Sequence, residues 1–160
     1  MIDPVEWRAL RRLFGSAFGS SLHVSVSTVD AGGAPVVTPI GSFFLAEPGR
    51  AFYFELYARR LGERLDADPR VSVLAVDSGK LLWLRALFTG RFARRPAVRL
   101  VGRAEPGSRE ATETERARFV RRVGPAWRLR GSQRLWGGLV RVREIRIDRV
   151  ERIGLGPMST

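Results

Sequence analysis

A run of alternating strands and turns between residues 22 and 68 constrains the fold of this chain most strongly. Its first segment, Leu22 to Val29, alternates with a period of two, which is typical of a strand with one buried face. The turn Asp30-Ala31-Gly32-Gly33 tolerates positive φ angles, so the chain can reverse into a second strand from Pro35 to Gly41. The two segments therefore predict an antiparallel hairpin.

A third strand and a helix complete this stretch. After a Pro-Gly turn, Ala51 to Tyr57 forms an aromatic-rich strand, and a helix begins at the paired Arg59 and Arg60. Free N–H groups at a helix start and nearby guanidinium groups both favour an anion. A phosphate site at this join is one interpretation, and a solvated pair of arginines is the other.

Two sequence patterns in this stretch resemble a known family. VSTVDAGGAPVVTPIG, followed by FYFELYARRLGERLDADPRVSV, is similar to the pyridoxamine 5'-phosphate oxidase-like family of flavin-binding split barrels over about residues 20–104. In that family the second strand lies along the flavin ring, and a basic motif after the next strand holds the cofactor phosphate. The resemblance implies that the ring is lined by Thr38, Pro39, Ile40 and Gly41.

The same resemblance implies that Arg59 and Arg60 hold the phosphate. The family's usual second basic residue falls on Leu61, however, and its usual Asn before Leu65 is Arg64. Phosphate binding would then depend on Arg59, Arg60 and Arg64. FMN is the cofactor implied, and the deazaflavin F420 is the close alternative because related split barrels use either. Haem is a more distant option, since the only imidazole is His23, on a strand that we expect beside the barrel.

Length and composition limit the remaining possibilities. A chain of 160 residues with 44% hydrophobic content predicts one domain, residues 1–160, with a substantial core. The absence of cysteine excludes disulfides and thiolate metal sites, and one histidine argues against a zinc site or a Ser-His-Asp triad. We therefore expect no metal and assign no catalytic residue.

The formal net charge of +12 suggests nucleic-acid or membrane binding, but its distribution argues against both. Basic residues are spread from Arg8 to Arg152, and no RNA-binding motif is present. The apolar stretches are too short to span a bilayer, and Asp3 and Glu6 are unlike a signal peptide. We expect a cytoplasmic protein without a nucleic-acid or membrane partner.

Outside the hairpin region, the pattern predicts helices and strands with several open points. Asp3 caps a helix, and residues 15–21 form a flexible joint after it. Residues 70–76 and 97–104 form strands, with Gly102 at a bulge or a close backbone approach, whereas residues 81–88 are compatible with either helix or strand. A capping box at Thr112 opens a further helix whose arginines we expect to be solvated.

The last third of the chain contains an irregular loop and a closing strand. Residues 124–138 are predicted as a loop, and residues 140–153 as a strand with a bulge near Arg143-Glu144. Because the family's flavin commonly lies between two subunits, Gln133, Arg134 and Trp136 are candidates for contacts with the flavin of a second subunit. Ordinary loop packing is the alternative.

Together, these features predict a mainly β fold, a split antiparallel barrel of about six strands with two or three peripheral helices. Its parts are a helix and joint (residues 1–20), a barrel core (21–104), a helix and loop (105–139) and a closing strand (140–153). The resemblance implies a homodimeric FMN-binding oxidoreductase that acts on a small organic substrate. An F420-dependent oxidoreductase and a non-catalytic carrier of flavin or another phosphate ligand are the alternatives.

Overall fold

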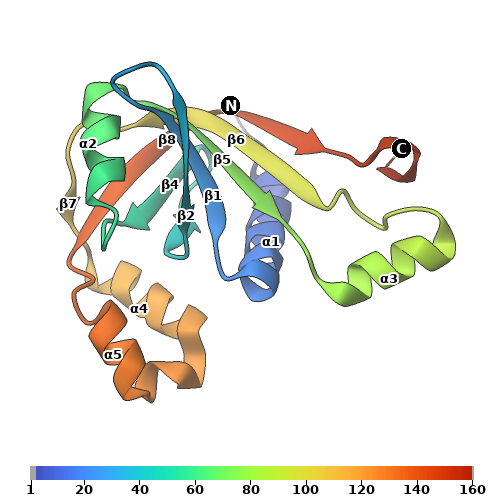
Figure 1. Cartoon of the computed structure of the whole chain (residues 1–160). Helices are drawn as coiled ribbons and strands as arrows, with labels where there is room; N and C mark the ends of the chain where they lie inside the picture. Colours follow the sequence, from blue (N-terminus) through green and yellow to red (C-terminus); the bar gives the residue numbers. More distant parts are fainter. Residues whose placement is uncertain (1–2, 160) are drawn as a thin grey trace.

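The chain forms a mainly β half-barrel with helices around it (Figure 1). The computed structural model describes residues 3–159, so residues 1, 2 and 160 of the predicted domain lie outside it. One antiparallel sheet of eight strands has the order β2-β1-β5-β6-β8-β4-β3, with β7 paired to β8. Because β2 and β3 lie at opposite ends of this order, the barrel is split, as the sequence predicts.

The strand bounds match the predicted strands closely and add two short ones, β3 and β7. The strands are β1 (Val24–Val29), β2 (Pro35–Ile40), β3 (Phe43–Leu45), β4 (Arg50–Phe54), β5 (Arg70–Val76), β6 (Ala97–Ala104), β7 (Arg109–Glu110) and β8 (Arg141–Ile153). Strand β4 ends three residues earlier than predicted. Tyr57 has a φ of 57°, which is incompatible with a continuing strand.

Among residues 3–159 there are five α-helices. They are α1 (Pro4–Ser21), α2 (Arg59–Ala67), α3 (Lys80–Thr89), α4 (Glu113–Val123) and α5 (Arg130–Trp136), with 3₁₀ turns η1 (Gly124–Arg128) and η2 (Gly156–Ser159). The ambiguous segment at residues 81–88 is thus a helix. The predicted loop at residues 124–138 was wrong, because η1 and α5 occupy most of it. No helix in the described part is long and apolar enough to cross a bilayer.

Helix α1 fills one end of the barrel. Asp3 caps it as predicted, and its apolar stripe of Trp7, Leu10, Phe14 and Ala17 joins the barrel core. The prediction of a flexible joint at residues 15–21 was wrong, since the helix continues to Ser21. Ala17 is fully buried one turn after Phe14, so packing offsets the low helix propensity of the glycines.

A second apolar cluster lies on the opposite face of β4. Along β4 the side chains alternate, so that Tyr53 belongs to the barrel core whereas Phe52 and Phe54 pack with Phe119 of α4. The sequence pattern predicted that the arginines of α4 are solvated, and this was wrong for Arg118 and Arg122, which pack on aromatic rings. The Arg122 guanidinium lies 3.5 Å from the centre of the Phe44 ring, and burial lowers its pKa to about 10.

Strand β8 contributes to both clusters, and this explains its apparent change of phase. Val142 faces the second cluster, whereas Ile145 and Ile147 face the barrel core. The predicted bulge near residues 143–144 was wrong, because pairing with β4 is continuous there. The bulge lies at Asp148 instead, opposite the step between Val101 and Gly102. A Cβ on Gly102 would lie 2.1 Å from the Arg146 carbonyl oxygen, so the predicted close approach is confirmed.

Candidate functional site

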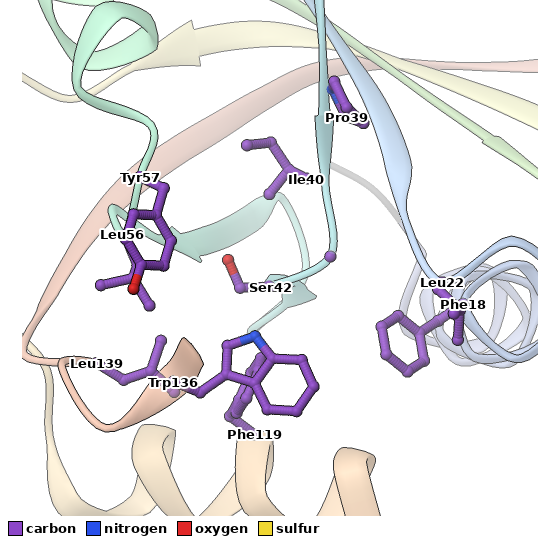
Figure 2. A pocket seen from close by; sticks show the side chains of 11 residues that line it. Phe18, Leu22, Pro39, Ile40, Ser42, Leu56, Tyr57, Phe119, Trp136 and Leu139 are labelled. Atoms are coloured by element: carbon purple, nitrogen blue, oxygen red, sulfur yellow. The ribbon is translucent and has the colours of Figure 1, made fainter. Parts of the chain in front are cut away.

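The end of β2 borders a cavity of about 200 Å³ (Figure 2). Strand β2, the C-terminal end of α1, the turn after β4, and helices α4 and α5 enclose it. Aromatic and aliphatic side chains dominate its lining, which comprises Phe18, Leu22, Pro39, Ile40, Gly41, Ser42, Leu56, Tyr57, Phe119, Trp136 and Leu139. This lining suits a flat apolar ring system better than a charged group.

Three of the four residues predicted to line a flavin ring border this cavity: Pro39, Ile40 and Gly41. A Cβ on Gly41 would lie 2.9 Å from the Leu22 carbonyl oxygen, so the close approach of α1 to β2 requires glycine here. The fourth, Thr38, lies one residue before them on β2 and contacts α2 instead.

Tyr57 and Trp136 stand at the mouth of the cavity from different parts of the chain (Figure 2). Tyr57 is 79% exposed and has a left-handed backbone, an uncommon conformation for a residue other than glycine. Such strain often marks a functional position. Trp136 lines the cavity of its own chain, whereas Gln133 and Arg134 are exposed on α5 and do not line it.

The N-terminus of α2 meets the physical requirements for an anion site. Ala58 precedes the helix without a side-chain cap, and the first turn carries no acidic residue. Arg59 pairs with Glu63 at 2.9 Å, but both side chains are largely exposed. Among residues 3–159 Arg60 has no ion-pair partner, so its guanidinium is available to a ligand.

Arg64 connects α2 to the hairpin. Its Nε donates to the Thr28 hydroxyl oxygen at 3.0 Å, and its Nη2 donates to the Thr38 hydroxyl oxygen at 3.1 Å. Both acceptors are neutral hydroxyls, so neither contact pairs the guanidinium with an anion. Leu61, at the family's usual second basic position, is only 1% exposed and belongs to the barrel core.

A charged cluster around the buried Arg143 fixes the other end of α2. Arg143 of β8 is only 3% exposed, and it donates to Asp66 at 2.6 Å and to Glu55 at 3.1 Å. Burial lowers the pKa of Arg143, but the bonds to Asp66 and Glu55 outweigh this effect and raise it overall. Burial also raises the pKa of Tyr53, whose hydroxyl is buried beside this cluster. With Arg64 and Asp66 both anchored, the start of α2 is held in a fixed orientation.

Sequence reasoning missed Phe18, Tyr57, Phe119 and Leu139. Tyr57 lies two residues before Arg59 and could have been found from that position. Phe18 could not, because it lay in the segment predicted as a joint. His23 is exposed, does not line the cavity, and has its Nδ1 2.7 Å from the Ser21 carbonyl oxygen. In the described part of the chain, no group of three His, Asp or Glu residues could hold a metal ion.

Solved structures share this fold at low sequence identity. An FMN-binding protein from Syntrophomonas wolfei subsp. wolfei has a TM-score of 0.61 and 12% identity, with 94% of this chain and 90% of that chain covered. The haem storage protein HutZ from Vibrio cholerae has a TM-score of 0.57 and 17% identity, with 98% of both chains covered. An F420 reductase has a TM-score of 0.58 and 15% identity, with 88% and 97% covered.

Sequence comparison identifies the family directly. No curated protein matches the chain significantly. The family model described as pyridoxamine 5'-phosphate oxidase, however, matches residues 16–153, which include the hairpin, α2 and all the strands of the half-barrel. The chain therefore belongs to the pyridoxamine 5'-phosphate oxidase family of split barrels.

Proposed function

We propose that this protein binds FMN and is an oxidoreductase that acts on a small organic substrate. The flavin ring would lie against Thr38 to Gly41, and its phosphate would lie at Arg59, Arg60 and Arg64. One observation carries the proposal: the contact between Arg64 and Thr38 at 3.1 Å joins the expected phosphate site to the expected ring site. Family membership supports the same cofactor.

The residues present fit a phosphate-bearing cofactor. The uncapped start of α2 supplies free N–H donors, and Arg60 supplies a guanidinium without an acidic partner in the described chain. Leu61 is buried in the barrel core, so the family's second basic group cannot come from that position. Arg64 lies on the same helix and can replace it.

When bound, FMN supplies hydride or single-electron transfer. The chain would bind the ring, orient it and exclude water through Phe18, Tyr57 and Trp136. The polar side-chain groups of the cavity are the Ser42 and Tyr57 hydroxyls and the Trp136 indole N–H, and Ser42 already donates to the Phe54 carbonyl oxygen. We therefore assign no protein acid or base to the reaction.

A homodimer would complete the site. The cavity of about 200 Å³ is smaller than the roughly 300–1,000 Å³ of typical ligand pockets, so one chain alone does not enclose a cofactor. A second copy would cover its open side, and Gln133 and Arg134 would be candidates for contacts across that interface. Trp136 would contribute from the same helix.

F420 is the alternative cofactor, because an F420 reductase shares the fold. Both cofactors carry a phosphate, so both would use the start of α2. The haem storage protein among the solved structures raises haem as a third ligand, but the exposed position of His23 does not favour it. A non-catalytic flavin carrier is the remaining alternative, and reduction of the bound flavin by NAD(P)H with reoxidation by candidate acceptors distinguishes it from an enzyme.

Titration with FMN and, separately, with F420 tests the cofactor proposal. Each charge-assisted hydrogen bond is worth about 1.5–3 kcal/mol. The double variant Arg59→Ala and Arg60→Ala should therefore bind FMN about a hundredfold or more weakly. Its stability without cofactor should change little, since both side chains are exposed. Arg64→Ala should weaken binding and also destabilise the apo protein, because it removes both hydroxyl contacts.

The matched control is Arg8→Ala with Arg121→Ala, which removes two exposed charges elsewhere. It should leave FMN affinity within about threefold of the parent, since distant surface charges are screened. If both double variants lost FMN affinity equally, the net charge of the protein would determine affinity, and not specific contacts of Arg59 and Arg60 with the phosphate. No binding of FMN or F420 at micromolar concentration would remove the cofactor proposal.

A further inference from the structure

A larger cavity, of about 490 Å³, lies away from the β2 site. It is bounded by the middle of α1, the loop before β6 with the start of that strand, and the end of β8, and it shares no lining residue with the β2 cavity. Its lining comprises Ala9, Leu10, Arg12, Leu13, Ser16, Arg94, Arg95, Ala97, Val98 and Arg152. Leu10, Ala97 and Val98 are buried and form the floor, whereas the arginines are exposed at the rim.

The charge of this cavity is unbalanced. Four of its lining residues are arginines and none is acidic. The comparable cavity between β4 and α4 differs, since its three arginines are matched by Glu47, Glu115 and Glu144. The positive excess is therefore a feature of this cavity and does not simply follow from an arginine-rich chain.

Two of the four arginines are oriented by contacts with neighbouring side chains. Arg94 donates to the buried carboxylate of Asp77 and to the Ser16 hydroxyl oxygen. Arg152 pairs with Glu6 at 3.0 Å. These contacts orient the rim before any ligand arrives, which lowers the entropic cost of binding.

The other two arginines have no acidic partner. Arg95 donates to the Arg152 carbonyl oxygen at 3.2 Å, which positions it without neutralising its charge. Arg12 has no ion-pair partner among residues 3–159. A guanidinium fork is suited to a carboxylate or phosphate, and binding is stronger where apolar surface excludes water.

We propose that this cavity binds an amphiphilic anion, a carboxylate or phosphate monoester on an apolar body. The anionic group would lie at Arg12 and Arg95, and the apolar body would lie on Leu10, Leu13 and Val98. The volume lies within the range of about 300–1,000 Å³ that is usual for small-molecule pockets. This site is independent of the proposed flavin site.

Calorimetric titration of the full-length protein with decanoate and with decyl phosphate, below their micelle concentrations, tests the proposal. Each methylene from hexanoate to decanoate should tighten binding by up to about fourfold, since it buries further apolar surface. The double variant Arg12→Gln and Arg95→Gln should bind decanoate about tenfold or more weakly. The control Arg121→Gln with Arg128→Gln removes two exposed arginines of α4 and η1, which do not line this cavity, so it carries the same net charge and should bind within about twofold of the parent.

A second variant does not depend on removing arginines. Ala9→Glu, at an exposed position of α1, places a competing carboxylate at the cavity and should also abolish decanoate binding while leaving the fold intact. The double variant Arg59→Ala with Arg60→Ala should bind decanoate as the parent does, so a failed flavin site does not affect this test. Equal binding of decanol, retention of affinity in both cavity variants, or loss of decanoate binding in the Arg59→Ala with Arg60→Ala variant would each overturn the proposal. The stronger of decanoate and decyl phosphate identifies the anionic group.

Discussion

At the residue scale, the arginines of this chain have several different structural roles. Arg122 packs on the Phe44 and Phe18 rings, Arg143 is buried in an ion-pair cluster, and Arg64 links a helix to a hairpin. Arg60 remains free of an acidic partner in the described part of the chain. The guanidinium group can fill all these roles because its planar face packs on aromatic rings while its edge donates hydrogen bonds.

The cluster around Arg143 predicts a dependence of stability on acid. The hydrogen bond from Arg143 holds the pKa of Asp66 below its ordinary 3.8. A lowered carboxyl pKa stabilises the folded state above the ordinary value, and this contribution is lost as pH falls through the folded pKa. Urea unfolding should therefore show a loss of stability as pH falls below about 4.

Asp66→Asn should flatten part of that acid dependence and lower stability at pH 7. It should not remove the dependence entirely, because a hydrogen bond from Arg109 also lowers the pKa of Glu115. The control is Glu63→Gln, which removes the largely exposed partner of Arg59. An unchanged acid slope in Asp66→Asn would show that the Arg143 contact does not persist in solution.

Residue patterns predicted some of these roles and missed others for a clear reason. The capping box at Thr112 is local, and both of its hydrogen bonds are present. The packing of Arg118 and Arg122 depends on Phe44 and Phe52, which are distant in sequence. A helix pattern reports which side of a helix is polar, but not which distant rings will cover a cation.

At the element scale, local patterns located the strands better than they located helix ends. Strand alternation reflects burial of one face and is visible in the sequence. The continuation of α1 through residues 15–21 depends on packing of Ala17 in the barrel, which a local pattern that includes two glycines does not reveal. In β8, side chains on both faces are buried, and this changed the alternation in the sequence in the way that a bulge near residues 143–144 would.

A pair of glycine substitutions tests both corrections. Gly15 is exposed within α1, and an added Cβ would meet no atom within 4 Å, so Gly15→Ala should stabilise the protein by about 0.5–1 kcal/mol. Gly102→Ala should destabilise it by about 1–3 kcal/mol or more, because the methyl group would collide with the Arg146 carbonyl. Urea denaturation measures both. A neutral Gly15→Ala would favour a flexible joint, and a neutral Gly102→Ala would argue against the close strand approach.

At the scale of the whole molecule, the candidate site is assembled from segments that the sequence separates widely. The hairpin and α2 were predictable because their motifs are contiguous. The aromatic wall was not, because Phe18, Phe119 and Trp136 come from α1, α4 and α5 and meet only through the fold of the half-barrel (Figures 1 and 2). The cavity that these elements form is only about 200 Å³, and this leads to a final prediction about assembly.

If a second copy completes the cofactor site, FMN binding and self-association must be coupled. A ligand that binds the dimer more tightly than the monomer shifts the equilibrium toward the dimer, and the coupling is reciprocal. Sedimentation velocity across a dilution series should therefore show more dimer with FMN than without it. FMN affinity should correspondingly weaken as the protein is diluted below the dimer dissociation constant.

The variant Tyr57→Ala distinguishes the coupling between FMN binding and association from the binding of the phosphate by Arg59 and Arg60. The side chain is exposed in the isolated chain, so its loss should affect apo stability little. At the mouth of the cavity it should weaken both FMN binding and FMN-induced association, whereas Arg59→Ala with Arg60→Ala should weaken FMN binding and leave association of the apo protein unchanged. Tight FMN binding by a species that sediments as a monomer at every concentration would refute the shared site, because one chain would then enclose the cofactor alone.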